Sequence, residues 1–354
     1  MRDGVVLYAL KEEPLDIAHR EYEVLRRMEA AELPAVVPVG LSEAPERSEG
    51  VLVTRYLDHS LQYRRLLMRL GSGSEPYRDR LLDAMASLLV DLHRGGLYWG
   101  DCSLANTLFR RDGDRIQAYL VDAETSELHP SLSDGQRAYD LEVLVENVAF
   151  GLADLAAYAD RPEDFESSIA AAESVRTRYC SLWDELHAEV QLGTEDRYAV
   201  GARVRRLNDL GFSVDEIELE PGDRAGKLRL RVAVTTRRFH IRELERLTRL
   251  RALEGQARIL MNDVREYRAW LEWFERRPVD RTEGAHRWLH EVYEPTVARL
   301  ALAIGTERDP IQAYCDVLEH KWLLSEAAGR DVGLERAIAS YLAIGAPAPE
   351  ADPA

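Results

Sequence analysis

Three polar side chains near the middle of the chain have the types and the spacing that a metal-dependent site needs. Asp101 is followed five positions later by Asn106, and a second acid, Asp122, follows an apolar stretch further on. Asp112 and Gly113 lie in the turn of an expected hairpin, which would bring Asn106 and Asp122 together. Carboxylate and amide oxygens suit Mg²⁺. Asp101, on the loop before the hairpin, could orient or deprotonate a hydroxyl group.

The elements around these residues decide how the pattern is interpreted. Periodicity predicts a helix over 77–93 that ends at Gly95 and Gly96, and then a loop that contains Asp101. Taken alone, an Asp and an Asn five positions apart are better explained structurally, with Asp101 capping a turn, Asn106 beginning a strand and Asp122 ending one. The ordered series of helix, glycine stop, loop, hairpin and second acid favours a functional site.

A second pair of charges lies near the N-terminus. Residues 5–10 read as a buried strand, and Lys11 follows them directly. On the expected helix over 14–31, Glu21 projects into an apolar face, where an unpaired carboxylate is costly. Lys11 is therefore its expected partner, and the alternative is that Glu21 reaches solvent from the rim of that face.

These segments resemble protein-kinase-like enzymes, in the style of lipopolysaccharide and aminoglycoside kinases. The segments 98–109 and 121–130 carry the resemblance, and 8–11 resembles the kinase strand that ends in lysine. The whole chain resembles uncharacterised actinobacterial kinase-like proteins with a C-terminal domain of unknown function. The implied fold is α+β, a protein-kinase-like bilobal fold with a truncated N-lobe, followed by a mostly α-helical domain with one β-hairpin.

The resemblance also implies a role for each residue. Asp101 would act on the acceptor hydroxyl, while Lys11 and Glu21 would form the catalytic ion pair, with Lys11 also contacting the nucleotide. Asn106 and Asp122 would bind Mg²⁺. The cofactors would be ATP and Mg²⁺.

Four further residues match the family pattern at supporting positions. Thr54 would line the back of an adenine pocket, and Tyr56 and Leu57 would belong to the hinge that binds adenine through backbone groups. Asp140 resembles the helix acid that holds the catalytic loop from below. Its alternative is an ordinary charge in the first turn of a helix.

The chain departs from the kinase pattern in several places. Trp99 stands where kinases usually place His, and Glu124 follows Asp122 at a position where it could add a metal ligand. Ser103 replaces a lysine of Ser/Thr protein kinases, which argues against a Ser/Thr protein substrate. No glycine-rich phosphate loop precedes Lys11, so we expect either a start further upstream or the absence of a nucleotide lid.

The composition changes near residue 160, after which helical patterns dominate. We expect a kinase-like domain over 1–159, with a small lobe over 1–57 and a helical lobe over 58–159. A mostly helical domain over 160–344 and a disordered tail over 345–354 would follow. The expected helices of the second domain cover 163–190, 195–210, 240–276, 284–303, 309–328 and 333–343, with a hairpin around 221–226.

Charge and composition limit the partners. Lys and Arg number 46 against 63 Asp and Glu, a net charge of −17, which disfavours nucleic acid. No apolar run is long enough to span a bilayer, and the N-terminus has no signal-peptide pattern, so we expect a cytoplasmic protein. The aromatic stretch 267–274 could be an interface for a protein partner, although at helical spacing core packing is the commoner explanation.

Two functions remain from the sequence. The first is an ATP-dependent phosphotransferase acting on a small-molecule or glycan hydroxyl. The alternative is a pseudokinase-type nucleotide-binding or scaffold protein without turnover, whose C-terminal domain binds a protein partner. The complete set of polar site residues favours the first function, and the missing glycine-rich loop favours the second.

Overall fold

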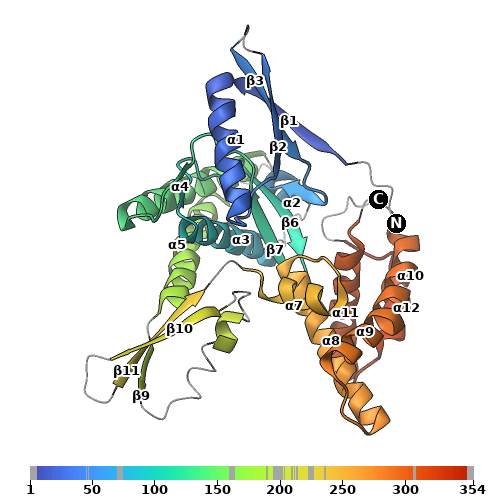
Figure 1. Ribbon diagram of the computed structural model, residues 1–354. Coiled ribbons are helices and arrows are strands. Elements are labelled where there is room, and N and C mark those ends of the chain that lie inside the picture. The colour runs from blue at the N-terminus through green and yellow to red at the C-terminus, as the bar shows by residue number, and fades with distance from the viewer. Residues whose placement is uncertain are drawn as a thin grey trace. The chain divides into compact units, whose positions relative to one another are not determined.

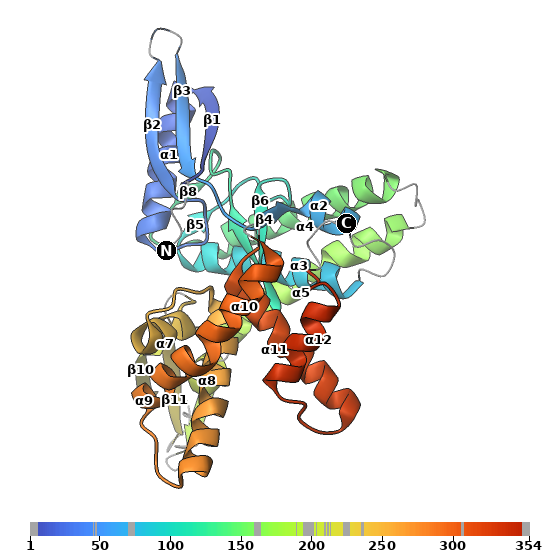
Figure 2. The ribbon, with the colours of Figure 1, turned by 90° about the vertical axis from the view of Figure 1, so that its right-hand side faces the viewer.

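A computed structural model divides the chain into two compact units (Figures 1 and 2). The first comprises residues 1–110 and 116–186, and the second comprises 111–115 and 187–354. The structure describes residues 6–44, 46, 48–69, 75–158, 164–188, 190–193, 202, 204–208, 210, 212, 214–221, 227–234, 237–305 and 308–348. In these described ranges, no helix is long and apolar enough to cross a membrane.

The first unit begins with a three-stranded antiparallel sheet and one helix. Strands β1 (Tyr8–Pro14), β3 (Glu49–Arg55) and β2 (Pro38–Ala44) pair in that order, and helix α1 (Leu15–Ala30) follows β1 directly. Helix α1 packs tightly on the sheet, because a Cβ at Gly50 would lie 2.7 Å from the Cβ of Ala18. Because no residue separates β1 from α1, the end of the strand fixes the start of the helix.

The rest of the first unit is mainly helical. Its helices are α2 (Tyr63–Arg69), α3 (Glu75–Arg94), α4 (Asp134–Tyr158) and α5 (Asp164–His187). Its short strands are β4 (Ser60–Gln62), β5 (Leu97–Tyr98), β6 (Thr107–Asp112), β7 (Arg115–Leu120) and β8 (Glu127–Leu128). Strands β4, β6 and β7 form one sheet, while β5 pairs with β8. The expected hairpin is therefore present as β6 and β7, and the loop over 99–106 lies between β5 and β6.

Helix α5 explains why the first unit extends past the expected boundary at 159/160 to Leu186. Arg178 of α5 lies 2.6 Å from Asp83 and 3.0 Å from Asp79, both on α3. The side chain of Arg137 on α4 stacks over the ring of Trp183, 4.3 Å from its centroid. Because α5 packs on α3 and α4, it belongs to the same compact unit.

The second unit combines a sheet with a group of helices. Strands β9 (Val190–Gly193), β10 (Val214–Pro221) and β11 (Lys227–Val234) pair in the order β10-β11-β9, so the expected hairpin gains a third strand. The helical elements are α7 (Phe239–Thr248), α8 (Glu254–Glu275), α9 (Arg281–Trp288), the π-helix η2 (Leu289–Tyr293), α10 (Glu294–Ile304), α11 (Pro310–Ala328) and α12 (Leu334–Ala343). The expected helix over 195–210 falls mostly outside the described residues, and 204–208 are helical.

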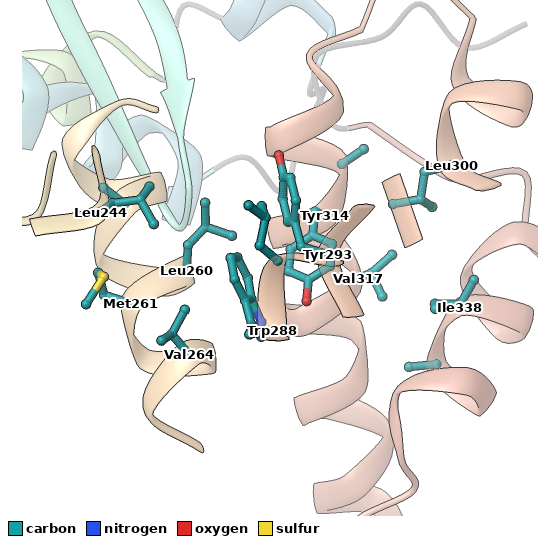
Figure 3. Close-up of a cluster of buried hydrophobic side chains, with 14 of the residues drawn as sticks. Leu244, Leu260, Met261, Val264, Trp288, Tyr293, Leu300, Tyr314, Val317 and Ile338 are labelled. Atoms are coloured by element: carbon teal, nitrogen blue, oxygen red, sulfur yellow. The ribbon is translucent and has the colours of Figure 1, made fainter. Parts of the chain in front are cut away.

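The helices of the second unit share one buried core (Figure 3). Trp288, Tyr293 and Tyr314 lie together within it, with ring centroids 5.0–6.2 Å apart. The indole N–H of Trp288 and the hydroxyl of Tyr314 both donate to Asp263, at 2.7 Å and 2.6 Å. Burial raises the pKa of Asp263, and these two donors give its buried carboxylate the partners that it needs.

Two local expectations for the second unit were wrong. The single helix over 240–276 is two helices, because Arg249 adopts a left-handed φ of 63° and ends α7. The aromatic stretch is not core throughout, since Trp270, Trp273 and Phe274 are 48%, 75% and 65% exposed. Of the expected tail over 345–354, Ala346 is buried, and residues 349–354 lie outside the described residues.

The tip of the β6–β7 hairpin, residues 111–115, belongs to the second compact unit. The Asp112 carboxylate accepts hydrogen bonds from the N–H groups of Gly255 and Gln256, at 2.8 Å and 2.7 Å, in the first turn of α8. Gly113 donates its N–H to Gln312 at 2.8 Å, and Gln312 donates back to its carbonyl at 2.9 Å. A side chain at Gly113 would also meet Ile259 at 2.7 Å. These hydrogen bonds and this close packing make the tip an integral part of the second unit.

These contacts predict the stability of an Asp112→Ala variant. It should unfold with a free energy lower by about 2 kcal/mol, because two buried N–H groups at a helix start lose their acceptor. Urea denaturation of the full chain measures the change. The matched control is Asp114→Ala, which removes the more exposed pair with Arg258 and should cost about 0.5 kcal/mol or less. Equal losses for the two variants would contradict this role for Asp112.

Candidate active site

The Lys11 ammonium and the Glu21 carboxylate form a short ion pair in the first unit. Lys11 Nζ lies 2.8 Å from Glu21 Oε2, and the Glu21 side chain is fully buried. The other oxygen of Glu21 accepts the N–H of Ala123 at 3.0 Å. Helix α1 starts where β1 ends, so the lysine at the middle of the strand and the glutamate on the second turn of the helix face each other. The pairing expected from the sequence is present.

Three more carboxylates surround the same ammonium. Lys11 Nζ lies 3.0 Å from Asp122, 3.0 Å from Glu13 and 3.7 Å from Glu124. Burial by itself would lower the pKa of Lys11, but hydrogen bonds to Glu21, Glu13 and Asp122 outweigh it and raise that pKa above its ordinary value. The ammonium is therefore charged at every physiological pH, and its surroundings carry an excess of negative charge.

Burial also affects the partner of the ion pair. It raises the pKa of Glu21 to about 7, against the opposing effect of the bonds from the Ala123 N–H and Lys11. Without these two donors, burial would raise the pKa of this carboxyl further. Glu21 thus depends on Lys11, and its contact with Ala123 connects the ion pair to the segment that carries Asp122.

Asp101 and Asn106 form a second group on the loop before β6. The Asn106 side-chain amide donates to Asp101 Oδ2 at 2.9 Å and to the Asp101 carbonyl at 3.3 Å. Ser103 shapes the loop, since its Oγ accepts the Asn106 N–H at 3.2 Å and its carbonyl accepts the Thr107 hydroxyl at 2.8 Å. Asp101 itself is exposed, so its carboxylate is held in place and remains accessible.

A backbone contact connects the two groups. The N–H of Val121 donates to the carbonyl of Asn106 at 3.1 Å, next to Asp122. The hairpin explains this contact, because Asn106 immediately precedes β6 and only Val121 separates Asp122 from the end of β7. The structure thereby brings the two expected metal ligands to the same end of the hairpin.

Asp140 holds the loop that carries Asp101. Its fully buried carboxylate accepts the N–H groups of Trp99 and Gly100, at 2.7 Å and 2.8 Å, and contacts His93 Nε2 at 3.1 Å. Gly100 has a φ of 82°, a backbone conformation that residues with a side chain rarely adopt, so glycine suits the turn before Asp101. Of the two interpretations of Asp140, its contacts agree with a support for the loop and not with an ordinary helix charge.

The three residues expected to face adenine lie at the end of β3 and just after it. Thr54 is buried and pairs with Ala9, two residues before Lys11 on the neighbouring strand, which places Thr54 and Lys11 on one face of the sheet. Tyr56 is 46% exposed and donates its N–H to the Leu7 carbonyl at 3.0 Å. The Leu57 carbonyl accepts the Ser60 hydroxyl at 2.7 Å. None of the three makes a contact that by itself identifies a ligand.

Sequence reasoning missed three residues of this region. Glu13 lies two positions after Lys11, so strand alternation could have placed both on one face. Asn147 of α4 donates to the Cys102 carbonyl at 2.8 Å, and no pattern in the sequence indicates this bond. His93 is the last residue but one of helix α3 and supplies an imidazole next to Asp140, whereas Trp99 stands at the position where kinases usually place His.

Asn106 and Asp122 carry donor atoms of the kind that Mg²⁺ takes when it binds together with phosphate. Within the part of the chain that the structure describes, no group of three or more His, Cys, Asp or Glu side chains could hold a metal. Mg²⁺ is commonly bound by one or two carboxylates, with substrate phosphates and water completing the shell. The Asp122 carboxylate and the Asn106 side-chain oxygen are hard donors of that kind.

Comparisons with known proteins agree with the division seen along the chain. Residues 8–161 match the model of the lipopolysaccharide kinase (Kdo/WaaP) family, and 181–344 match a domain of unknown function, DUF4032. A search of curated proteins finds no match.

Among solved structures, WaaP in complex with acyl carrier protein is similar, with 20% identity and a TM-score of 0.34, over 52% of this chain and 83% of that chain. The kinase domain of Mycobacterium tuberculosis PknI, as a double mutant, is similar with 15% identity and a TM-score of 0.31, over 49% of this chain and 84% of that chain.

The resemblance expected from the sequence is thus confirmed for both parts of the chain. The fold class is also as expected, α+β with small sheets and a mostly helical C-terminal part. The N-terminal part of the chain matches the model of the lipopolysaccharide kinase (Kdo/WaaP) family, and the C-terminal part matches that of DUF4032.

Proposed function

We propose that this protein is an ATP-dependent phosphotransferase that transfers a phosphoryl group to a hydroxyl of a small molecule or glycan. The observation that carries the proposal is the position of the Lys11 ammonium, bonded to buried Glu21 at 2.8 Å and to Asp122 at 3.0 Å. A strand lysine held by a helix glutamate beside a metal-binding acid is the arrangement that positions nucleotide phosphates in kinases.

Each side chain then has one task. Lys11 binds the phosphates of the nucleotide, and Glu21 holds Lys11 in place. Asn106 and Asp122 hold Mg²⁺, which, when bound, neutralises charge on the phosphate oxygens. Asp101 accepts or orients the proton of the acceptor hydroxyl, and its bond from Asn106 fixes the carboxylate for that purpose.

The excess of carboxylates has a consequence for nucleotide binding. Glu13, Glu21, Asp122 and Glu124 surround a single ammonium. A polyphosphate without a cation would meet net repulsion here, since like charges at these distances oppose each other. We therefore expect nucleotide binding to depend strongly on the divalent cation.

The same observation favours a second candidate, a scaffold protein without turnover. An ammonium that already has several carboxylate partners is stabilised in the absence of nucleotide. Such a protein would bind nucleotide weakly or not at all, and the C-terminal domain would carry its function by binding a protein partner.

The first prediction of the proposed function separates the metal ligand from the residue that acts on the acceptor. Asp122→Asn should weaken Mg·ATP binding by at least tenfold, because the variant loses a charge that offsets the metal. Asp101→Asn should bind Mg·ATP nearly as the wild type does. Thermal-shift titrations with ATP, with and without Mg²⁺, measure both effects.

Two outcomes would count against this division. If Asp101→Asn lost nucleotide binding as fully as Asp122→Asn, the two acids would not have separate roles. If the wild type showed no shift with millimolar Mg·ATP, the scaffold function would be the better account.

The second prediction concerns the ion pair. Lys11→Met leaves Glu21 buried without its cation and should destabilise the fold by on the order of 2 kcal/mol, less than for a fully buried pair because Lys11 is partly exposed. Adding Glu21→Gln should recover most of that stability while nucleotide binding stays lost. Urea denaturation and thermal-shift titration measure the two properties separately.

The control for this pair is Glu124→Gln, which removes the longest and most exposed of the four contacts and should leave stability almost unchanged. If Lys11→Met alone had wild-type stability, Glu21 would not depend on Lys11 and this part of the proposal would be wrong.

A further inference from the structure

Helix α5 lies mostly outside both family matches, which end at residue 161 and begin at residue 181. It nevertheless contributes a buried tyrosine that contacts the residues holding the loop with Asp101. The hydroxyl of Tyr179, whose side chain is almost fully buried, lies 2.8 Å from His93 Nδ1. In Figures 1 and 2, α5 lies beside α3, the helix that ends near His93.

The direction of each hydrogen bond in this chain of contacts follows from its chemistry. The Asp140 carboxylate is an acceptor, so His93 Nε2 carries the hydrogen that faces it, at 3.1 Å. Burial lowers the pKa of His93, and the imidazole is neutral near pH 7. Its Nδ1 is then an acceptor, and Tyr179 donates its hydroxyl hydrogen to it.

The far end of the same contacts is the backbone next to Asp101. Asp140 accepts the N–H groups of Trp99 and Gly100. A carboxylate with three donors has little freedom to rotate, and an imidazole bonded at both nitrogens has little freedom to turn. Without the hydroxyl of Tyr179, one end of the imidazole is released while the other still contacts Asp140.

Aromatic packing holds Tyr179 itself in place. Its ring meets that of His93 edge to face, with centroids 5.5 Å apart, and stacks on that of Trp183 at 5.8 Å. Trp183 in turn lies under Arg137, which is three residues before Asp140 on α4. The tyrosine therefore reaches His93 from a fixed position.

We propose that Tyr179 is a positioning residue of the phosphotransfer site, acting through His93 and Asp140 on the backbone that presents Asp101. The role in turnover rests on the function proposed above, whereas the role in ordering the loop does not. Residues of α5 then belong functionally to the kinase-like unit, although neither family match covers most of them.

The test removes the hydroxyl and keeps the ring. Tyr179→Phe in the full chain should exchange the amide hydrogens of Trp99 and Gly100 about fivefold faster, the effect of losing one buried hydrogen bond. Hydrogen–deuterium exchange without nucleotide measures this. The matched control is Tyr139→Phe, the neighbour of Asp140 on α4, whose exposed side chain should have no such effect.

Kinetics provide the second readout. Tyr179→Phe should lower kcat for ATP turnover severalfold with the KM for ATP unchanged, because Lys11 and Asp122 are not touched. In a His93→Gln background, Tyr179→Phe should add little to either readout, since the proposed effect of its hydroxyl on the loop passes through His93.

The outcomes distinguish this inference from the proposed function. If the wild type has no turnover, faster exchange at Trp99 and Gly100 in Tyr179→Phe still supports the positioning role. Unchanged exchange at these amides overturns it, even in an active enzyme. If Tyr179→Phe no longer unfolded cooperatively, the positioning role would also be overturned, because the hydroxyl would then stabilise the fold as a whole and not the loop alone.

Discussion

The site depends on one electrostatic constraint, the pairing of a buried glutamate with the only ammonium near it among the described residues. Glu21 cannot carry its charge in the interior without Lys11 and the N–H of Ala123. Lys11 in turn reaches Asp122, so strand β1, helix α1 and the segment after β7 are fixed relative to one another. Any movement of one element would leave a buried charge without its partner.

Asp101, on the loop before β6, is positioned by hydrogen bonds and not by burial. Asp101 is exposed and has no burial to hold it, so the order of its loop comes from backbone bonds to Asp140 and from the side chain of Asn106. In the function proposed above, the exposed carboxylate on this well-ordered loop serves the substrate hydroxyl and the buried pair serves the nucleotide. The two groups meet at the base of the hairpin, through the bond from Val121 to Asn106.

Much of this arrangement could be predicted from the sequence because it is local. The spacing of Asp101 and Asn106, the turn at Asp112 and the apolar face around Glu21 each depend on residues close in the chain. His93 and Tyr179 could not be predicted in the same way, since their contacts join helices distant in sequence. The break at Arg249 was missed because a non-glycine residue adopts the left-handed conformation there.

The most direct test of the account is acceptor-free ATP hydrolysis by the full chain with Mg²⁺, since many phosphotransferases transfer slowly to water. The account predicts a measurable rate in the wild type that falls at least a hundredfold in Asp101→Asn, while nucleotide binding persists. An equal rate in the two proteins would contradict the role of Asp101. A wild type that binds Mg·ATP but never hydrolyses or transfers its phosphate would contradict the account as a whole.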